Sequence, residues 1–309
     1  MTSEADRIPG NVSYKSIIRQ GEISGALFNW KKMKKKDIPG IEDLLFSIEE
    51  NYVSACGRFL ARNDSKDIIW LLRNKNDICS LIINSRSTVI PVLAAKTPLL
   101  YSRNELINQL IRLKSFFKTK NIHSVQGLKE EVIIMEEAIN HAGKKPVDTI
   151  DYDLMSLDKL PVSYTKFPNL VLKIPQLTDI DAIAPLQAAY EQEEVIPKGS
   201  VFSPAASRAN ISNIIANGRI LAAQLDGRMI GKINVSAVSF TRYLVGGVYV
   251  HRDFRGLGIA RRMASEFIAS LINEGKAITL FVKKNNIAAR RLYAGLGFTA
   301  NADYRIIYY

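Results

Sequence analysis

The sequence predicts a mixed α/β protein made of two halves with the same order of elements. Apolar stretches of strand length alternate with longer segments of helical periodicity along the chain. Each half contains a run of neighbouring strands followed by a strand–helix–strand unit. Matching elements are offset by roughly 150–160 residues with negligible sequence identity, so the repeat is inferred from element order alone. A chain of 309 residues is long enough for about two domains.

Three turn signals divide the second half: Asn217-Gly218 ends a helix, Asp226-Gly227 forms a hairpin and Glu274-Gly275 ends a long helix. The expected strands run over 171–174, 219–225, 229–238, 243–250 and 277–282, followed by two short strands at the end of the chain. Helices are expected from a cap at Thr178 or Asp179 to residue 190, and over 206–216, 255–273 and 286–296. Residues 191–204 are expected to form a turn-rich connector.

The first half repeats this order. We expect two helices over 41–60, a hairpin of strands 68–73 and 78–84, a strand at 88–93, a helix at 104–118, a strand at 123–126, a helix at 128–141 and a strand at 147–154. The linker between the halves is expected near 156–168. Residues 13–33 are expected to form a helical extension.

Composition is that of an ordinary globular protein, with 47% hydrophobic and 23% charged residues. No apolar run approaches the roughly 20 residues that span a bilayer, and the N-terminus lacks a signal-peptide core. The two cysteines, Cys56 and Cys79, and three scattered histidines show no metal-ligand spacing. We therefore expect a cytoplasmic protein without a bound metal or membrane contact.

The formal net charge is +12, and the basic excess is spread over both halves. Part of the excess in the second half suits a phosphate-rich ligand. No interleaving of aromatic and basic residues indicates a nucleic-acid site, so nucleic acid is not an expected partner. The dense basic run at 31–36 is most simply a solvated helix end or connector, with nucleic-acid or membrane contact as the alternative.

The most informative segment is 248–260, V-Y-V-H-R-D-F-R-G-L-G-I-A, where a strand, a basic loop and an amphipathic helix follow one another. Gly256 and Gly258 have no Cβ, so their N–H groups can approach an anion closely. The helix start adds unpaired N–H groups and the positive end of its dipole, and Arg255 adds a forked cationic donor. The segment therefore predicts a phosphate-binding loop. It lacks the residues of a P-loop and of a dinucleotide fingerprint.

This loop spells R-x-x-G-x-A and resembles the pyrophosphate loop of the GNAT superfamily of N-acetyltransferases, which bind acetyl-coenzyme A. Farther along, Asn286, Ala289 and Tyr293, closed by Gly297-Phe298, match the spacing of the second GNAT signature. Asn286 suits a helix N-cap, and Ala289 and Tyr293 share one face of that helix. The motifs stand in the family's order, and the resemblance covers residues 170–309, under half of the chain.

The resemblance implies the GNAT fold, with two GNAT-like domains in tandem and acetyl-CoA as co-substrate. Together with the element order, it divides the chain into a helical extension over 1–36, a degenerate GNAT-like domain without a cofactor site over 37–160, and a catalytic domain over 169–309. At the position of the phosphate loop, the first half reads A-A-K-T-P-L-L-Y-S-R-N, which has no glycine. An unrelated α/β domain is the alternative for this half.

By the same resemblance, the strand backbone would hold the acetyl carbonyl and the pantetheine arm, while the loop would hold the pyrophosphate. The implied cofactor-binding residues are Val248, Tyr249, Val250, Arg255, Gly256, Leu257, Gly258, Ile259, Ala260, Arg261, Asn286 and Ala289. Tyr293 would be the general acid that protonates the leaving thiolate. Gly246-Gly247 would splay the strand, or would form a bulge without function. Further cations that could reach the phosphates are Arg262, Lys283, Lys284, Arg290 and Arg291.

The sequence defines the general base least well. Many relatives carry a glutamate on the strand before the loop, but this strand, Y-L-V-G-G-V-Y-V, has no acid and offers Tyr249 as the polar substitute. Glu191, Glu193 and Glu194 lie where this fold usually walls the acceptor site, and neighbouring acids raise one another's pKa. Glu194 is the candidate base, because the apolar Val195-Ile196 beside it suggests burial. A solvated acidic turn is the alternative.

These features predict an acyl-CoA-dependent N-acyltransferase that moves acetyl from acetyl-CoA to the amine of a small molecule or amino acid. One alternative is a CoA-binding sensor or scaffold module without turnover. Another is an acetyltransferase for a protein or RNA acceptor, which the basic balance suggests. Acceptor loops vary most in this fold, so the acceptor has no signature in the sequence.

Overall fold

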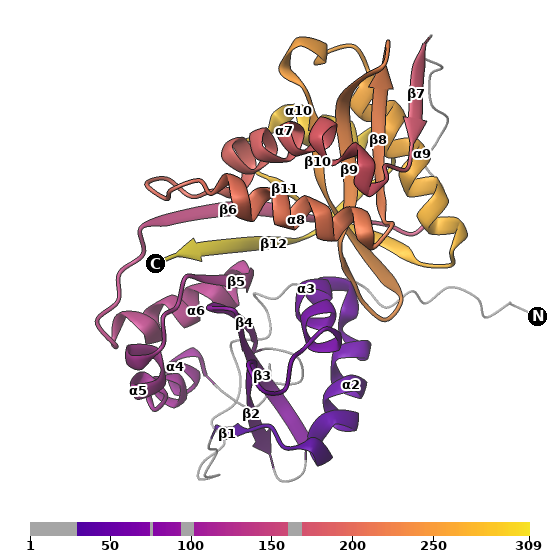
Figure 1. Cartoon of the computed structure of the whole chain (residues 1–309). Coiled ribbons are helices and arrows are strands. Elements are labelled where there is room, and N and C mark those ends of the chain that lie inside the picture. The colour runs from indigo at the N-terminus through magenta and orange to yellow at the C-terminus, as the bar shows by residue number, and fades with distance from the viewer. Residues whose placement is uncertain (1–29, 75–76, 94–101, 160–168) are drawn as a thin grey trace, which may run out of the picture.

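The computed structural model describes residues 30–74, 77–93, 102–159 and 169–309 (Figure 1). Twelve strands form one continuous sheet in the order β1-β2-β3-β4-β5-β12-β6-β11-β10-β9-β8-β7. The strands are β1 (Lys31–Lys32), β2 (Ile68–Asn74), β3 (Asp77–Ser85), β4 (Thr88–Val92), β5 (Ser124–Leu128), β6 (Asp148–Leu157), β7 (Leu170–Lys173), β8 (Ile220–Leu225), β9 (Arg228–Val238), β10 (Arg242–Val250), β11 (Ala277–Lys283) and β12 (Thr299–Tyr308). The two halves of the chain therefore share a single sheet.

Helices cover both faces of this sheet. They are α2 (Ile38–Ser47), α3 (Glu49–Leu60), α4 (Arg103–Ile111), α5 (Lys114–Thr119), α6 (Lys129–Asn140), α7 (Ile180–Tyr190), α8 (Pro204–Ala216), α9 (Ile259–Asn273) and α10 (Ile287–Ala294). Ile230 of β9 belongs to a core cluster with Met263 of α9, whereas the preceding residue, Met229, clusters with Ile183 of α7 and Ile211 of α8. Successive strand residues point to opposite faces, so α9 lies on one face and α7 and α8 lie on the other.

The first half has the same layers. Ile82 of β3 clusters with Leu110 of α4, while the next residue, Ile83, clusters with Leu44 of α2 and Phe59 of α3. In both halves the fourth strand pairs in parallel with the fifth, β4 with β5 and β10 with β11. The shared layering and parallel pair agree with the element order predicted for the two halves.

The halves exchange strands at the centre of the sheet, where β6 and β12 run side by side (Figure 1). β6 comes from the first half, yet it lies between β11 and β12 and pairs antiparallel with both. β12 comes from the second half, and it pairs antiparallel with β5 of the first half. Each half therefore contributes a strand that completes the sheet between the two.

A second joint ties α3 to the turn between β9 and β10. The Glu49 carboxylate, 5% exposed, accepts hydrogen bonds from the Thr241 backbone N–H at 2.8 Å and from the hydroxyls of Ser239 and Thr241. Gly57, farther along α3, lets the helix approach β9 closely, because a Cβ there would lie 3.0 Å from the Ala237 Cβ. The first half therefore fixes the end of the β9–β10 hairpin.

Two element boundaries in the second half differ from expectation. The helix expected over 255–273 begins at Ile259, because Gly258 adopts a φ of +82°, which an α-helix cannot contain. Arg252–Phe254 form a separate 3₁₀ turn ahead of it. The two short strands expected at the end of the chain are one strand, β12, with a register shift between Ala300 and Ala302.

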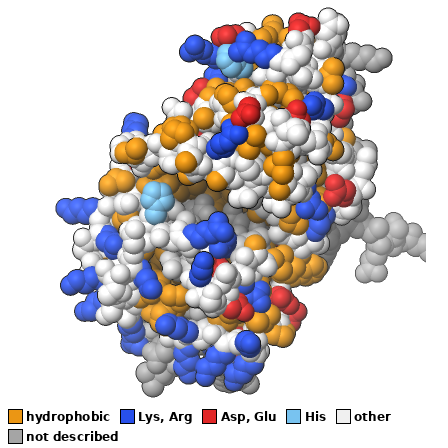
Figure 2. All heavy atoms as spheres, in the orientation of Figure 1, with side chains coloured by type: hydrophobic (Ala, Val, Ile, Leu, Met, Phe, Trp, Pro, Cys, Tyr) orange, Lys and Arg blue, Asp and Glu red, His pale blue; other side chains and the backbone are white. Residues whose placement is uncertain are grey.

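Three other segments also differ. Residues 191–195, expected to lie in an irregular connector, extend α7 as a π-helical turn. The helix expected over 104–118 is divided into α4 and α5. Lys31 and Lys32, expected at the end of a helix, form the edge strand β1 against β2; the rest of the predicted extension, up to residue 29, lies outside the described residues, as does most of the expected linker. On the face in Figure 2, lysine and arginine side chains are spread over both halves.

Asp151 on β6 should make the fold sensitive to acid. Hydrogen bonds from Arg305 of β12 and Lys129 of α6 lower the pKa of this carboxyl to about 2. Because the folded-state pKa lies below the ordinary 3.8, the carboxylate stabilises the fold above about pH 4, and this contribution is lost as the pH falls toward 2. Asp151→Asn should reduce the loss of unfolding free energy between pH 4 and 2 by about 1–2 kcal/mol, allowing for partial exposure.

Urea denaturation at several pH values checks this expectation. Asp226→Asn is the matched control, because Asp226 is exposed in a hairpin turn at a φ of +47°, which asparagine tolerates. If Asp151→Asn and wild type lose stability in parallel as the pH falls, Asp151 is not a source of the acid sensitivity.

Candidate active site

The site is centred on β10, which stops pairing with its neighbour β11 partway along its length. β10 pairs with β11 only from Arg242 to Val245, and its register with β9 shifts between Gly246 and Tyr249. A bulge of this kind bends the strand and leaves backbone groups unpaired. Beyond Val245, backbone groups of β10 that do not pair with β11 therefore border the space between the two strands.

Gly247 is required for this departure. Its φ is +61°, a region that favours glycine, and a Cβ there would collide with Asn234 Oδ1 and lie 2.8 Å from Lys232 Nζ. A Cβ at Gly246 would lie 2.5 Å from Ser236 Oγ. The pair of glycines therefore allows β10 to sit directly against the polar side chains of β9.

Lys232 of β9 stabilises the bulge in β10 through a hydrogen bond to its backbone. It is fully buried, donates hydrogen bonds to the Gly247 carbonyl at 2.8 Å and to Asn234 Oδ1 at 3.2 Å, and its Nζ lies 4.5 Å from the centre of the Tyr190 ring. Burial lowers the pKa of Lys232 to about 7, although the nearby Glu191 opposes this shift. Lys232 is thus a buried amine whose charge depends on pH near neutrality.

The glycine loop follows β10 and leads into α9. Gly256 and Gly258 have φ values of +80° and +82°, and a Cβ added at either would meet open space. The loop borders a cavity of about 450 Å³, called here the loop cavity. Its walls are Glu193, Glu194, Val248, Tyr249, Val250, Phe254, Arg255, Gly256, Gly258, Ile259, Ala260, Arg261, Asn286, Ala288, Ala289, Arg291, Leu292 and Tyr293.

The predicted cofactor residues thus gather around one cavity, with a single exception. Leu257 does not line it, and its side chain is 53% exposed. Among the other cations considered, Arg291 lines the loop cavity, while Lys283 lines the neighbouring one. Arg262 pairs with Glu266, and Lys284 and Arg290 both pair with Asp153.

Helix α10 presents the second motif to the same cavity. Asn286 caps the helix, since its Oδ1 accepts a hydrogen bond from the Ala289 N–H at 3.0 Å, as its sequence position predicts. Tyr293 is 6% exposed and packs edge-to-face against Phe298. Burial, with smaller contributions from Tyr190 and Glu194, raises the pKa of Tyr293 above its usual value. Its hydroxyl therefore remains protonated at neutral pH.

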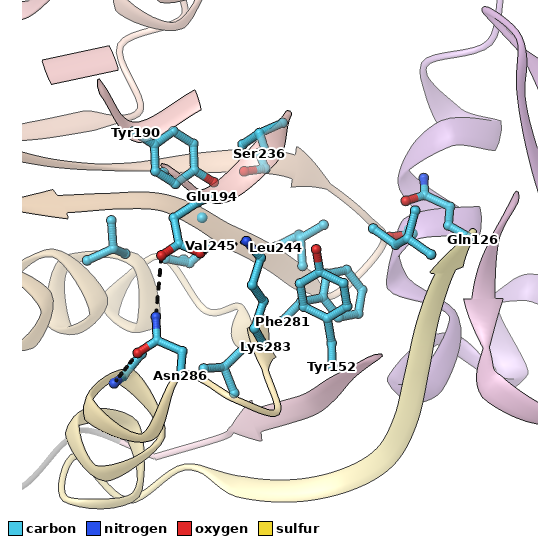
Figure 3. A pocket seen from close by; sticks show the side chains of 18 of the residues that line it. Gln126, Tyr152, Tyr190, Glu194, Ser236, Leu244, Val245, Phe281, Lys283 and Asn286 are labelled. Carbon is cyan, nitrogen blue, oxygen red and sulfur yellow. Dashed lines mark hydrogen bonds and ion pairs between the residues drawn. The ribbon is translucent and has the colours of Figure 1, made fainter. Parts of the chain in front are cut away.

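A second cavity of about 320 Å³, called here the inner cavity, adjoins the first (Figure 3). Both are bordered by Glu194, Val248, Asn286, Ala289 and Tyr293. The inner cavity is also bordered by Ser54, Gln126, Tyr152, Tyr190, Val195, Ser236, Leu244, Val245, Gly246, Gly247, Phe281, Val282, Lys283, Ile306 and Tyr308. These walls come from both halves of the chain.

The three clustered glutamates have different partners. Glu193 accepts hydrogen bonds from Arg255 at 2.7 Å and from the Tyr249 hydroxyl at 2.8 Å. Although partial burial opposes the change, these bonds lower the pKa of Glu193, so the expectation that the cluster raises its pKa is wrong for this residue. Tyr249, which donates to a carboxylate and whose pKa is raised by burial, is not arranged to accept a proton.

Glu194, the candidate base, lies between the two cavities. It pairs with Lys283 Nζ at 3.1 Å and accepts a long hydrogen bond, 3.5 Å, from Asn286 (Figure 3). Its apolar neighbour Val195 does not bury it as expected, because Val195 is itself 42% exposed. Glu194 is instead partly covered by the residues across the two cavities. Glu191 faces elsewhere and accepts hydrogen bonds from Gln187 and Asn210.

Sequence reasoning missed Lys232 and, apart from Tyr293, the aromatic residues of the inner cavity. The period-two pattern of β9 does place Lys232 and Asn234 on one face of an otherwise apolar strand, which is a signal of buried polar groups. Tyr152 and Tyr308 carry no such signal, because they reach the cavity only through the strand exchange. The first-half segment that replaces the glycine loop, residues 94–101, lies outside the described residues. Over the described ranges, no three potential metal-ligating side chains gather and no helix is long and apolar enough to span a bilayer.

Lys232 should make stability rise with pH. Its pKa is lower in the folded protein than the ordinary 10.5, so between about pH 7 and 10.5 the unfolded chain binds more protons, and folding becomes more favourable as the pH increases. Lys232→Met should flatten this rise when unfolding free energy is measured at about pH 7 and 9.5. Lys36→Met, which changes an exposed lysine, is the control. An equally steep rise in Lys232→Met would contradict the burial argument.

Comparison with known proteins agrees with this geometry. The profile of the acetyltransferase (GNAT) family matches residues 186–298, which include the glycine loop, α9 and α10. No curated protein matches the sequence at a significant level. A solved protein structure from Drosophila is similar over 91% of this chain and 98% of its own, with a TM-score of 0.66 at 11% identity.

Two further structures resemble the chain over both halves. A GCN5-related N-acetyltransferase from Sphaerobacter thermophilus matches 91% of this chain and 94% of its own, with a TM-score of 0.60 at 15% identity. A tandem GNAT protein from the clavulanic acid biosynthesis pathway matches 91% and 97%, with a TM-score of 0.58 at 14% identity. These likenesses show the fold, and the family profile covers the segment that carries both motifs. We conclude that residues 186–298 form an acetyltransferase (GNAT) family domain, within a fold that the chain shares with a tandem GNAT protein.

Proposed function

We propose that the chain is an N-acetyltransferase that transfers acetyl from acetyl-CoA to the amine of a small molecule. The observation that supports this best is the junction of the two cavities at Glu194, Val248, Asn286, Ala289 and Tyr293. A thioester reaching inward from the loop cavity and an amine in the inner cavity would meet at these residues. The 320 Å³ inner cavity lies at the lower end of the range for ligand pockets, which favours a small acceptor over a protein or RNA.

The loop cavity suits the pyrophosphate of coenzyme A. Gly256 and Gly258 leave open space where side chains would stand, and Gly258 places the start of α9 beside that space. Arg255 is the cation of the loop, and in this state Glu193 holds it at 2.7 Å. A phosphate would compete with that carboxylate for Arg255. We further propose that only the second half binds CoA, and that the first half shapes the acceptor site.

The residues at the junction suit acyl transfer. The splayed backbone at Val248 would hold the acetyl carbonyl as it gains negative charge. Tyr293, kept protonated by burial, would give its proton to the departing sulfur. Glu194 would take a proton from the attacking amine, and an arriving ammonium would compete with Lys283 for this carboxylate.

The Glu194–Lys283 ion pair also favours a second candidate, a CoA-binding module without turnover, because a cation already occupies the carboxylate. Release of free thiol from acetyl-CoA in the presence of amines distinguishes the two. Steady thiol release that requires an amine supports the enzyme. CoA binding without thiol release across amines, amino acids and polyamines supports the binding module.

Gly258→Val should abolish or strongly weaken CoA binding. Valine is strained at a φ of +82°, and its side chain would enter the space beside the helix start. Isothermal titration calorimetry measures the effect. Gly143→Val is the matched control, because Gly143 has a φ of +84° and open surroundings but lines neither cavity. Equal CoA affinity in Gly258→Val and wild type would remove the loop from the cofactor site.

Tyr293→Phe should lower kcat on the order of tenfold to a thousandfold, because it removes the proton donor but keeps the ring. CoA affinity should change little. Single-turnover kinetics measure the chemical step directly. Tyr304→Phe is the control, since Tyr304 is a buried tyrosine that borders neither cavity. An unchanged single-turnover rate in Tyr293→Phe would exclude this tyrosine as the acid.

A further inference from the structure

The inner cavity has an aromatic wall. Five of the side chains that border it carry aromatic rings, and they come from five different elements of the fold. They are Tyr152 of β6, Tyr190 of α7, Phe281 of β11, Tyr293 of α10 and Tyr308 of β12. Tyr152 and Phe281 stand edge-to-face, with ring centres 6.5 Å apart. A wall of this kind favours flat, apolar ligand groups and groups that interact with ring faces.

The charges on the cavity wall cancel. Among the described residues that border it, Glu194 and Lys283 are the charged ones, and they form an ion pair at 3.1 Å. The other polar side chains on the wall, apart from the tyrosines, are the neutral Ser54, Gln126, Ser236 and Asn286. A ligand carboxylate or phosphate would therefore enter without a free cation to meet it, and burying an uncompensated charge is costly.

The surroundings of Glu194 instead suit a cation. Its charge contributes to the raised pKa values of Tyr152, Tyr190 and Tyr293, in each case after the larger effect of burial, so all three phenols lie within its field and stay neutral. The Tyr190 ring already contacts an amine, since Lys232 Nζ lies 4.5 Å from its centre. Ring faces and a carboxylate together attract an ammonium group.

The arrangement also gives the ligand a direction. Glu194 and Asn286 lie at the junction with the loop cavity, whereas Tyr152, Phe281 and Gln126 lie on the other side of Lys283 (Figure 3). An amine held at Glu194 would therefore extend its body toward Tyr152 and Phe281. This far part of the cavity is bordered by the exchanged strands β6 and β12 and by residues of the first half.

We propose that the acceptor is a protonated primary amine on an apolar, aromatic body that carries no negative charge. This inference rests on the proposed acetyl transfer and narrows its substrate class to arylalkylamines, excluding amino acids with a free carboxylate. In the reaction the C–N bond forms and the C–S bond breaks. Of the two protons that the ammonium loses, one passes to Glu194 and then to solvent. The other replaces the proton that Tyr293 gives to the sulfur.

The same chemistry favours product release. The amide product is neutral, so it no longer interacts as a cation with Glu194 or with the ring faces. The amine substrate therefore makes a cation interaction with the cavity wall that the amide product lacks. A neutral acetamide should bind more weakly than its parent amine.

The test compares three acceptors of similar size: phenethylamine, 2-cyclohexylethylamine and phenylalanine. Thiol release from acetyl-CoA gives kcat/KM, and calorimetry in the presence of CoA gives the affinity of each acceptor without turnover. Phenethylamine should exceed the cyclohexyl amine by about fivefold, a typical ring contribution. It should exceed phenylalanine by at least about a hundredfold, because of the buried carboxylate. N-acetylphenethylamine should bind more weakly than phenethylamine.

Two variants locate the preference. Tyr152→Leu should reduce the advantage of the aromatic amine over the cyclohexyl amine while leaving CoA affinity unchanged. Phe116→Leu is the control, because Phe116 packs on Trp70 in the first half and borders neither cavity. Loss of the same preference in both variants would assign it to general destabilisation and overturn the role of the aromatic wall.

These measurements distinguish failure of the proposed acceptor class from failure of the proposed acetyl transfer. If phenylalanine binds or reacts as well as phenethylamine, the substrate class is wrong, and acetyl transfer stands only if thiol is released. If phenethylamine binds with the expected preference but no acceptor releases thiol, the aromatic site stands as an amine-binding site and the transferase proposal fails. If none of the three acceptors binds or reacts, the inferred amine class is overturned, whatever the affinity for CoA.

Discussion

The departure of β10 from β11 after Val245 is the constraint on which the rest of the site depends. Hydrogen-bonded strands leave no room for a ligand, so a cavity within a sheet requires that one strand turn away. Here the turn depends on Gly247, whose missing side chain makes room for Asn234 and Lys232. Lys232 then fixes the bulged carbonyl at 2.8 Å. Both cavities border the stretch of β10 beyond this point.

The strand exchange decides what surrounds the opened space. In a single half, the gap beside β11 would be bordered by that half's own strands. In this chain β6 lies beside β11, and β6 and β12 bring Tyr152 and Tyr308 to the inner cavity. Ser54 and Gln126 add walls from α3 and β5. The first half thus supplies part of the wall of the inner cavity even though the family profile matches only the second half.

Local patterns explain why the loop and α10 could be predicted. The loop depends on glycines beside a helix start, and the capping of α10 depends on Asn286 and a neighbour three residues away, so both are visible in short stretches of sequence. Most strands and helices were likewise predicted from periodicity and turn residues. These features need no knowledge of how distant segments meet.

The remaining features depend on contacts between segments that are far apart in the sequence. β5 pairs on one side with β12, more than half the chain away, and no sequence pattern in either strand predicts this pairing. The environment of Glu194 depends on Lys283 and Asn286, so its neighbours in sequence gave a misleading reason for choosing it. Lys232 was overlooked because lysine is ordinarily exposed, and its burial follows from the bulge on the adjacent strand.

The pairing of β12 with β5 has a consequence for the order in which the protein is made and folded. While a ribosome synthesises the chain, β5 emerges long before β12, its neighbour on one side in the sheet. β6 likewise waits for both β11 and β12. The nascent first half therefore exposes an open strand edge, which is a template for unwanted pairing with other chains. Contacts so distant in sequence also slow folding, so this edge stays open until β12 has been made and can pair with β5 and β6.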